Sequence, residues 1–309
     1  MRAFVTGGAG FLGSAVVDRL LAEGHAVDVV DDLSTGRLSN LAEARADRAA
    51  VLKIHQSDIR NPEISELIAR RQPDVVFHLA DGRTDDAAAD AAVNVVGSLH
   101  VLEGARRAAA RKIVFATGAE IYGEPDPSTL PLRESQPQAP TTAHGVGKKA
   151  VVDYLRLYRE RHGIEFTALA LSSVYGPRQY PPHGVVAAFA RALLDGTAPQ
   201  VHGDGTQTRD FLYVDDAVDA IVRAADRGSG LMVNVGRGVE TSVGTLLALM
   251  VEALGRPSAE PMTVPRRPGD VDRVTLDSGR ARMQLGWEPW TSLEEGVSQV
   301  LRWSVSNPA

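Results

Sequence analysis

Three glycines near the start of the chain are spaced for contact with a phosphate group. Gly7, Gly10 and Gly13 lie three residues apart, after the apolar run 2–5 and before residues 14–21, whose apolar side chains recur at helical spacing. A strand that turns into a helix this quickly needs glycines, because side chains there would block a pyrophosphate. The free N–H groups and the positive dipole end of the helix can then hold the phosphates. The pattern predicts a dinucleotide site, with an ordinary strand–turn–helix as the alternative.

An acidic pair follows the next predicted strand, at the distance typical of such sites. The apolar run 26–30 ends in Asp31 and Asp32, and a carboxylate there can accept both hydroxyls of an adenosine ribose. The charge of Asp31 would repel a 2′-phosphate, so we expect NAD rather than NADP. The positive charge of Arg37 would weaken this preference for NAD if it lay near the ribose, but we interpret Arg37 as a solvated loop residue.

Predicted strands alternate with predicted helices over the first half of the chain. The strands are expected at Arg2–Thr6, Ala26–Asp31, Val51–His55, Asp74–Leu79, Lys112–Ala116 and Phe166–Leu171, and the helices at Phe11–Glu23, Pro62–Arg71, Ala87–Ala109 and Ala143–Arg161. Strands that are apolar on both faces and alternate with helices indicate a parallel sheet that is covered on both sides. We therefore predict an α/β fold, a Rossmann-type doubly wound parallel sheet, with its ligand at the carboxyl ends of the strands.

The pattern changes after residues 174–178, where short elements are joined by glycine and proline turns. These elements are expected at 185–194, 200–205, 209–213, 215–225 and 241–254. We predict a cofactor-binding domain over 1–172, with contributions from 209–235, and a smaller C-terminal substrate-binding lobe over 173–309. The proline-rich loop 125–140 either tethers two elements or covers the ligand.

Composition excludes several classes of protein. The chain has 309 residues, of which 44% are hydrophobic and 23% charged, as is ordinary for a globular protein. Its net charge of −6 argues against general binding to nucleic acid or to membrane surfaces. Cysteine is absent, so there is no disulfide or thiolate chemistry, and we expect no metal. Because the glycine turn begins at residue 6, with no room for a signal peptide, we predict a cytoplasmic protein.

Further motifs occur in order along nearly the whole chain. They are Thr6–Gly13, 31–36, Asp58-Ile59, His78-Leu79-Ala80, 94–97, Ile121-Tyr122-Gly123, 174–178, 203–214 and 267–270. Together they resemble the extended short-chain dehydrogenase/reductases, in particular the NAD-dependent sugar-nucleotide epimerase/dehydratase group. Within this group the chain is most similar to UDP-glucose 4-epimerases of the short bacterial and archaeal type.

The resemblance implies a tightly held NAD that is regenerated in each turnover. Asp31 would bind the adenosine ribose, and Asp58 with Ile59 would contact the adenine. The residues implied to contact the cofactor are Gly7, Gly10, Phe11, Leu12, Gly13, Asp31, Asp32, Ser34, Thr35, Gly36, Asp58, Ile59, Leu79, Ala80, Arg83, Asn94 and Lys148.

The catalytic helix departs from the family pattern. The family pairs a tyrosine with a lysine four residues later, near a serine or threonine. Here His144 stands in place of the tyrosine before Lys148, and Gly118 stands in place of the hydroxyl residue, next to Thr117. One hypothesis makes His144 the base, kept neutral by the charge of Lys148, with Thr117 supplying the hydroxyl. The other makes His144 a remnant in a site that has lost the family reaction.

Glu120 aligns with a glutamate that takes the C5 proton in sugar-nucleotide 4,6-dehydratases. The aspartate that precedes it in those enzymes is Ala119 here, so the acid for the departing hydroxyl is missing and dehydration is disfavoured. Glu120 is therefore either a base beside the sugar or a structural carboxylate. The predicted catalytic residues are His144, Lys148, Thr117 and Glu120.

The second lobe keeps more of the family's substrate residues. Arg209 and Arg267 match arginines that clamp the nucleotide diphosphate, a role that suits a bidentate guanidinium, with surface ion pairs as the alternative. Asp270 would accept from the nucleoside ribose, and 200–202 would line the base. Ala170 and Ser173 stand where the epimerases carry arginine and asparagine. The residues predicted to contact the substrate are Ser173, Val185, Gln200, His202, Arg209, Arg267 and Asp270.

These residues together predict a NAD-dependent nucleotide-sugar 4-epimerase of the UDP-glucose/UDP-galactose type. Such an enzyme oxidises the sugar at C4, lets the 4-keto sugar rotate, and returns the hydride to the other face. The alternatives are dehydration, decarboxylation or ketoreduction of a UDP- or dTDP-sugar, or a catalytically weak protein that only binds NAD and a sugar nucleotide. The apolar stripes of 87–109 and 143–161 also suit a homodimer through a four-helix bundle, as the family often forms.

Overall fold

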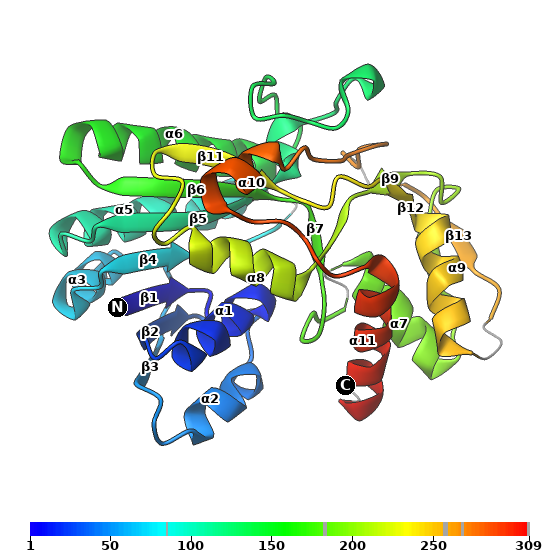
Figure 1. Cartoon of the computed structure of the whole chain (residues 1–309), viewed down its shortest axis with the longest axis horizontal. Helices are drawn as coiled ribbons and strands as arrows, with labels where there is room; N and C mark the ends of the chain where they lie inside the picture. The colour runs from blue at the N-terminus through cyan, green and yellow to red at the C-terminus, as the bar shows by residue number, and fades with distance from the viewer. Residues whose placement is uncertain (85, 182–183, 256–258, 267–268, 308–309) are drawn as a thin grey trace.

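A seven-stranded parallel sheet forms the centre of the protein. The computed structural model describes residues 1–84, 86–181, 184–255, 259–266 and 269–307. The strand order is β11-β6-β5-β4-β1-β2-β3, with every neighbouring pair parallel. The strands are β1 (Arg2–Thr6), β2 (Ala26–Asp31), β3 (Leu52–Gln56), β4 (Val75–His78), β5 (Lys112–Gly118), β6 (Glu165–Leu171) and β11 (Leu231–Val235). This is the doubly wound sheet that the sequence predicts (Figure 1).

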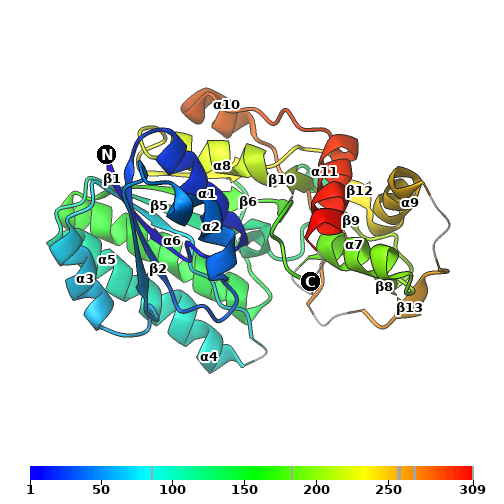
Figure 2. The same cartoon turned by 90° about the horizontal axis from the view of Figure 1, so that it is seen from below.

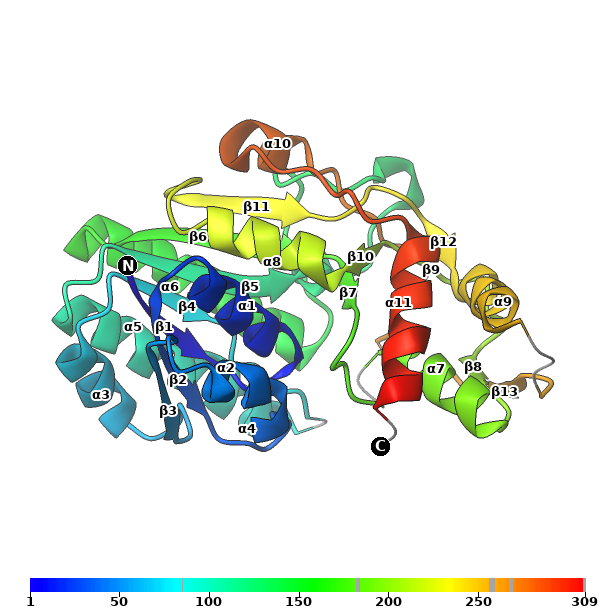
Figure 3. The same ribbon diagram turned by 60° about the horizontal axis from the view of Figure 1, so that its bottom comes forward.

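Helices cover both faces of the sheet (Figures 2 and 3). One face carries α1 (Phe11–Ala22) and α8 (Val214–Arg223), and the other carries α3 (Glu63–Arg71), α5 (Ser98–Arg107) and α6 (Ala143–His162). Successive strand residues point to opposite faces, so each strand feeds two apolar cores. Val5 packs in the first core with Leu20 of α1, and its neighbour Phe4 packs in the second with Ile68 of α3.

The helix expected at Ala87–Ala109 is divided into three pieces. A short α4 (Ala87–Ala91) continues into the π-helical segment η2 (Ala92–Gly97) and then into α5. The wider turn places the side chain of Asn94 against the loop after β4. Its Oδ1 accepts the N–H of Gly82 at 3.1 Å, and its Nδ2 donates to the carbonyl of Gly82 at 2.5 Å. The helix is thus divided at the turn from which Asn94 binds the backbone of that loop.

Most of the remaining elements form a second lobe, at the right of Figure 1, and α10 packs on β11 and α8. Helices α7, α9 and α11 pack on one another in that lobe, away from the sheet. Strand β7 pairs with β10 and β8 with β13, both in parallel, and β9 pairs with β12 in antiparallel orientation. The bounds of these elements and of the others outside the central sheet and its helices are η1 (Leu38–Leu41), α2 (Ala42–Ala46), η3 (Ala119–Tyr122), η4 (Pro127–Thr129), β7 (Ser173–Tyr175), α7 (Val185–Asp195), β8 (Gln200–His202), β9 (Thr208–Arg209), β10 (Phe211–Tyr213), β12 (Thr241–Ser242), α9 (Val243–Leu254), β13 (Met262–Val264), α10 (Gly279–Leu285) and α11 (Leu293–Ser306).

The short element expected at 209–213 is divided at Asp210, between β9 and β10. This carboxylate is only 1% exposed and accepts backbone N–H groups of Arg237, Gly238 and Leu276 at 2.9, 3.0 and 3.2 Å. Because these bonds satisfy a buried charge, the side chain ties the start of the second lobe to the chain after β11. Within the described ranges, every helix is too short or too polar to pass through a lipid bilayer.

Candidate active site

The turn between β1 and α1 has the geometry of a phosphate-binding loop. Gly7 has a φ of 69°, and a Cβ there would lie 2.8 Å from the backbone of Ala80, so only glycine fits. Helix α1 begins after Gly10 without a side-chain cap and without an acidic residue in its first turn. Its first N–H groups therefore face the carboxyl edge of the sheet uncapped, as a pyrophosphate requires.

Asp31 is fixed by the same loop. Its Oδ2 accepts the N–H of Ala9 and its Oδ1 the N–H of Leu33, both at 2.8 Å. Burial raises the pKa of Asp31, and these two hydrogen bonds offset part of the increase. A Cβ at Gly36 would lie 2.6 Å from Oδ1, so the glycine leaves room for the carboxylate. Each carboxylate oxygen keeps a second lone pair that a ribose hydroxyl can use, so the residues present fit a dinucleotide.

The other predicted cofactor residues lie on several elements around the carboxyl ends of the strands. Asp32 accepts from the backbone and hydroxyl of Ser34 at 2.9 and 2.6 Å, in the exposed loop that also contains Thr35. The carboxylate of Asp58 is bound by the backbone and guanidinium of Arg60, which lowers its pKa. Ile59 follows β3, Leu79 and Ala80 follow β4, Asn94 is part of η2, and Phe11 and Leu12 begin α1. Arg83 and Lys148 lie beside His144.

A directed chain of hydrogen bonds fixes the loop after β4. The N–H of Ala80 donates to Oγ1 of Thr6 at 3.2 Å, and Thr6 lies 2.7 Å from Nδ1 of His78. Nε2 of His78 lies 2.8 Å from Oγ of Ser98, which donates to the carbonyl of Asn94 at 2.7 Å. Because Ser98 uses its own proton for Asn94, Nε2 of His78 must carry a proton and donate to Oγ of Ser98. In the neutral ring, Nδ1 then accepts from the hydroxyl of Thr6. Burial lowers the pKa of His78 to about 3, with a smaller contribution from the charge of Lys148.

The predicted catalytic pair on α6 meets a residue that the sequence reasoning missed. Oδ1 of Asp81 lies 2.8 Å from Nε2 of His144 and 2.9 Å from Nζ of Lys148. Lys148 also donates to the carbonyl of Ala116 at 3.2 Å. The position of Asp81, two residues after the expected strand Asp74–Leu79, was the available signal, because the carboxyl ends of parallel strands hold ligand sites.

Glu120 meets the other side of the imidazole. Its Oε1 lies 3.1 Å from Nδ1 of His144. Arg83, which was predicted to contact the cofactor, also lies here, with Nη2 at 3.2 Å from the same Nδ1. A guanidinium can only donate, so the contact with Arg83 requires a neutral imidazole, whereas the ion pair with Glu120 requires a proton on Nδ1. The two contacts therefore belong to two protonation states of His144.

The expectation that Lys148 keeps His144 neutral is wrong. Burial alone lowers the pKa of His144, but the hydrogen bonds and charges of Asp81 and Glu120 outweigh it and raise the pKa above its ordinary value. Burial also raises the pKa of Glu120, yet the proximity of His144 and Arg83 leaves that pKa lowered. The pKa of Asp81 is held well below its usual range, because Lys148 and His144 outweigh the effect of burial. Two carboxylates thus favour the imidazolium.

Thr117 lies at the end of β5 but is covered. It is 4% exposed, and its hydroxyl oxygen is buried without a hydrogen-bond partner among the described residues. Glu120 is the side chain that fills the space next to Gly118, because a Cβ on that glycine would lie 2.8 Å from Cδ of Glu120. In this chain the carboxylate of Glu120 therefore lies next to position 118, where the family carries a hydroxyl residue.

The predicted substrate residues lie on several elements of the second lobe. Arg209 of β9 forms an ion pair with Asp270 and donates to the carbonyl of Thr208 at 2.7 Å. Nδ1 of His202 lies 2.8 Å from the carbonyl of Pro265. Gln200 begins β8, Ser173 begins β7, and Val185 begins α7. The predicted residue Arg267 lies outside the described residues.

The sequence profile of the NAD dependent epimerase/dehydratase family matches residues 3–236. The chain belongs to this family.

Its relatives include several UDP-glucose 4-epimerases. One from Mycolicibacterium smegmatis is 44% identical over 97% of both chains. The crystal structure of the enzyme from Thermotoga maritima with UDP-glucose matches with a TM-score of 0.94 at 36% identity and covers 100% of both chains. That of the Thermus thermophilus enzyme with NAD matches with a TM-score of 0.91 at 32% identity, over 99% of this chain and 100% of that one. These findings confirm the predicted family, fold and cofactor, NAD.

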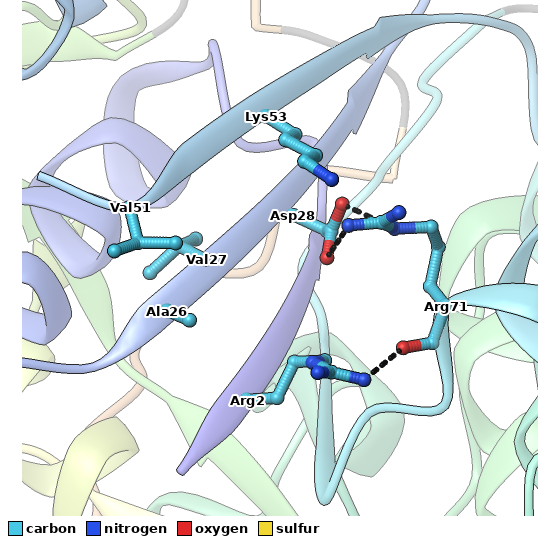
Figure 4. A pocket seen from close by; sticks show the side chains of 7 residues that line it. All are labelled: Arg2, Ala26, Val27, Asp28, Val51, Lys53 and Arg71. Carbon is cyan, nitrogen blue, oxygen red and sulfur yellow. Dashed lines mark hydrogen bonds and ion pairs between the residues drawn. The ribbon is translucent and has the colours of Figure 1, made fainter.

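Within this epimerase/dehydratase fold, a cavity of about 130 Å³ lies at the opposite edge of the sheet (Figure 4). Two of its lining charges are paired with each other, because Arg71 donates to both oxygens of Asp28 at 2.7 and 3.1 Å, and Arg2 donates to the backbone carbonyl of Arg71 at 3.0 Å. It lies at the amino ends of β1 and β2, away from the phosphate-binding loop. In the part of the chain that the structure describes, no group of three or more His, Asp and Glu side chains could hold a metal ion.

Proposed function

We propose that this chain interconverts UDP-glucose and UDP-galactose, or a closely related pair of nucleotide sugars, by 4-epimerisation with bound NAD. The observation that carries the proposal is that one edge of the sheet holds both the uncapped start of α1 and the acid–base cluster of His144, Lys148 and Glu120. Hydride transfer from a sugar carbon requires a proton to leave its hydroxyl, so the two features serve one reaction. The identity with the mycobacterial epimerase over nearly the whole chain supports the same substrate class.

The residues divide the work by position. The start of α1 and Asp31 hold the dinucleotide, which supplies hydride acceptance and return when bound. Lys148, buried at 4% exposure, places a positive charge beside the cluster and orients it through Asp81. Arg209 and Asp270 provide the donor and acceptor for the diphosphate and ribose of the nucleotide.

The test is NMR of purified protein with a panel of UDP- and dTDP-sugars and no added cofactor. A C4 epimer that forms from one of them establishes redox-neutral epimerisation with retained NAD. If every sugar stays unchanged while NAD is bound, the enzyme proposal is refuted, and a protein that only binds its ligands takes its place.

Dehydration is the second candidate, because the carboxylate of Glu120 is held within 3.1 Å of His144, beside the predicted sugar site. The same spectra separate the two reactions. A dehydratase gives a 4-keto-6-deoxy sugar and, in D₂O, incorporates deuterium at C5. We expect neither, because Ala119 leaves no acid for the departing hydroxyl at that position.

The proposed enzyme is a cytoplasmic homodimer that pairs through η2, α5 and α6. Val96 and Val146 support this arrangement, because they are 47% and 54% exposed although both are apolar. Light scattering with size-exclusion chromatography measures the mass directly. Val146→Glu, in the first turn of α6, is expected to shift the protein towards the monomer, and Val305→Glu, exposed on α11, is the control.

A further inference from the structure

The imidazole of His144 is enclosed on both sides. Its Nε2 lies 2.8 Å from Asp81 and its Nδ1 lies 3.1 Å from Glu120, and the side chain is only 7% exposed. A general base needs a lone pair that can reach the substrate. When both nitrogens hold protons shared with carboxylates, His144 has no such lone pair.

Glu120 differs from His144 in its accessibility. Its side chain is 29% exposed, and its Oε1 lies against the imidazole. Oε2 lies towards Gly118, where any Cβ would collide with it. We propose that Glu120 takes the proton from the sugar hydroxyl, and that His144 and Asp81 are positioning residues that hold it in place and ionised. This inference rests on the proposed function, because it assigns a role within that reaction.

The step balances with the groups already named. The O–H bond of the C4 hydroxyl breaks, and its proton passes to the Glu120 carboxylate while its electron pair forms the C4 carbonyl. NAD held by the start of α1 and by Asp31 would accept the hydride as the C4–H bond breaks, so the oxidation of the sugar would be balanced by reduction of the cofactor. The return step gives the hydride to the other face of C4 and the proton of Glu120 to the oxygen.

Four charged groups around His144 determine whether its imidazole is protonated. Asp81 lies in the loop after β4, Glu120 on η3, and Lys148 one turn along α6, with Arg83 on the same loop as Asp81. When Glu120 is ionised, the imidazolium pairs with it. When Glu120 has taken a proton, Nδ1 no longer faces a full charge, and Arg83 can use the same nitrogen once the imidazole is neutral. The ion pair between Glu120 and His144 is thus present before Glu120 takes the proton of the sugar and is lost afterwards.

The deciding measurement is kcat/KM against pH for the wild-type holoenzyme with UDP-galactose. Since His144 and Arg83 lower the pKa of Glu120, a Glu120 acceptor keeps kcat/KM level down to weakly acidic pH. A neutral His144 acceptor would instead give an acid limb at a pKa above 6.5. An acid limb below about pH 5.5 supports the proposal, and one above it overturns the proposal.

Substitutions test whether Glu120 contributes more to kcat than His144 does. Glu120→Gln is expected to lower kcat by about 100-fold or more with little change in KM, and Glu120→Asp to restore part of the loss. His144→Gln leaves the carboxylate in place and is expected to lose less than Glu120→Gln. The reverse order overturns the proposal. Glu160→Gln, exposed at the far end of α6, is the matched control and keeps wild-type kcat.

A readout without turnover separates this proposal from the proposed function. NMR titration of the imidazoles identifies His144 by its absence from His144→Gln. Its pKa is expected above 6.5 in the wild type, and lower in Asp81→Asn and in Glu120→Gln. A pKa below 6.5 in the wild type overturns the arrangement, whichever sugar is converted. If the titration agrees but no sugar is converted, the proposed function fails and the acceptor role fails with it. Turnover with an acid limb above about pH 5.5 overturns only the acceptor role.

Discussion

The carboxylate of Glu120 occupies the space that a side chain on Gly118 would need. A Cβ at position 118 would lie 2.8 Å from Cδ of Glu120, closer than carbon atoms approach without strain. The two residues are therefore a matched pair, and Oε1 of Glu120 reaches His144 from this place.

Gly118→Ser is expected to destabilise the protein by about 1–3 kcal/mol, because the added atoms displace a carboxylate that is ion-paired. Glu120→Ala removes the obstacle, so the double variant should be less destabilised than the sum of the single variants. Urea unfolding of the four proteins gives the interaction free energy, which we expect to be at least about 1 kcal/mol. Additive losses would show that the two side chains do not compete for the same space.

Asp31→Asn is expected to reduce the NAD retained through purification and to weaken NAD binding about tenfold or more. An amide turns an N–H donor towards the N–H of Ala9 or Leu33, which loosens the loop as well as removing the charge. The NAD released on denaturation is measured by its absorbance, and affinity by calorimetry. Asp32→Asn, on the exposed side of the same loop, is the control. Equal NAD content in both variants would refute the role of Asp31 at the ribose.

Arg209→Ala is expected to raise the Kd for UDP about 10- to 100-fold and to leave NAD binding unchanged. The variant loses charge-assisted hydrogen bonds to phosphate and leaves Asp270 unpaired beside an anion. Calorimetry with UDP measures the change. Arg191→Ala, which breaks an exposed pair with Asp195 on α7, should bind UDP like the wild type. An unchanged Kd in Arg209→Ala would make the Arg209–Asp270 pair purely structural.

Stability should rise with pH between about pH 4 and 6.5 because of His78. Its pKa is about 3 in the folded protein, against about 6.5 when unfolded. The unfolded state therefore binds the extra proton in this range, and the contribution is lost as pH falls, at up to about 1.4 kcal/mol per pH unit. His78→Gln should be less stable at pH 7 but show a shallower slope in urea unfolding. Equal slopes would mean that His78 is protonated in the folded state.

The sequence predicted the elements that carry strong local patterns. The glycine turn, the acidic residue that ends the second strand and the predicted catalytic pair on α6 all lie where their spacing indicated. In each case the residue pattern itself sets the geometry, since a tight turn needs glycine and one helical turn separates His144 from Lys148.

The surroundings of His144 could not be predicted in the same way. The expectation of a neutral imidazole considered Lys148 alone, because that residue is close in sequence. The two carboxylates that reverse the pKa shift come from other elements, Asp81 from the loop after β4 and Glu120 from η3. Only the packing of α6 against these loops brings the charges within hydrogen-bond distance, and a pKa depends on all of them together.

The π-helical turn at Ala92–Gly97 allows two contacts that a regular α-helix of the same length could not make together. Asn94 must face Gly82, which lies between Asp81 and Arg83, while α5 must turn its apolar side to α3. Each residue of an α-helix advances by about 100°, so deleting one residue from this turn would rotate one of these two faces away from its neighbour. The π-helical turn thus sets the rotation of α5 relative to Asn94, so that one helix both packs on α3 and holds the loop that carries Asp81 and Arg83. We therefore expect the site to tolerate the loss of a residue from this turn as poorly as the loss of one of its own side chains.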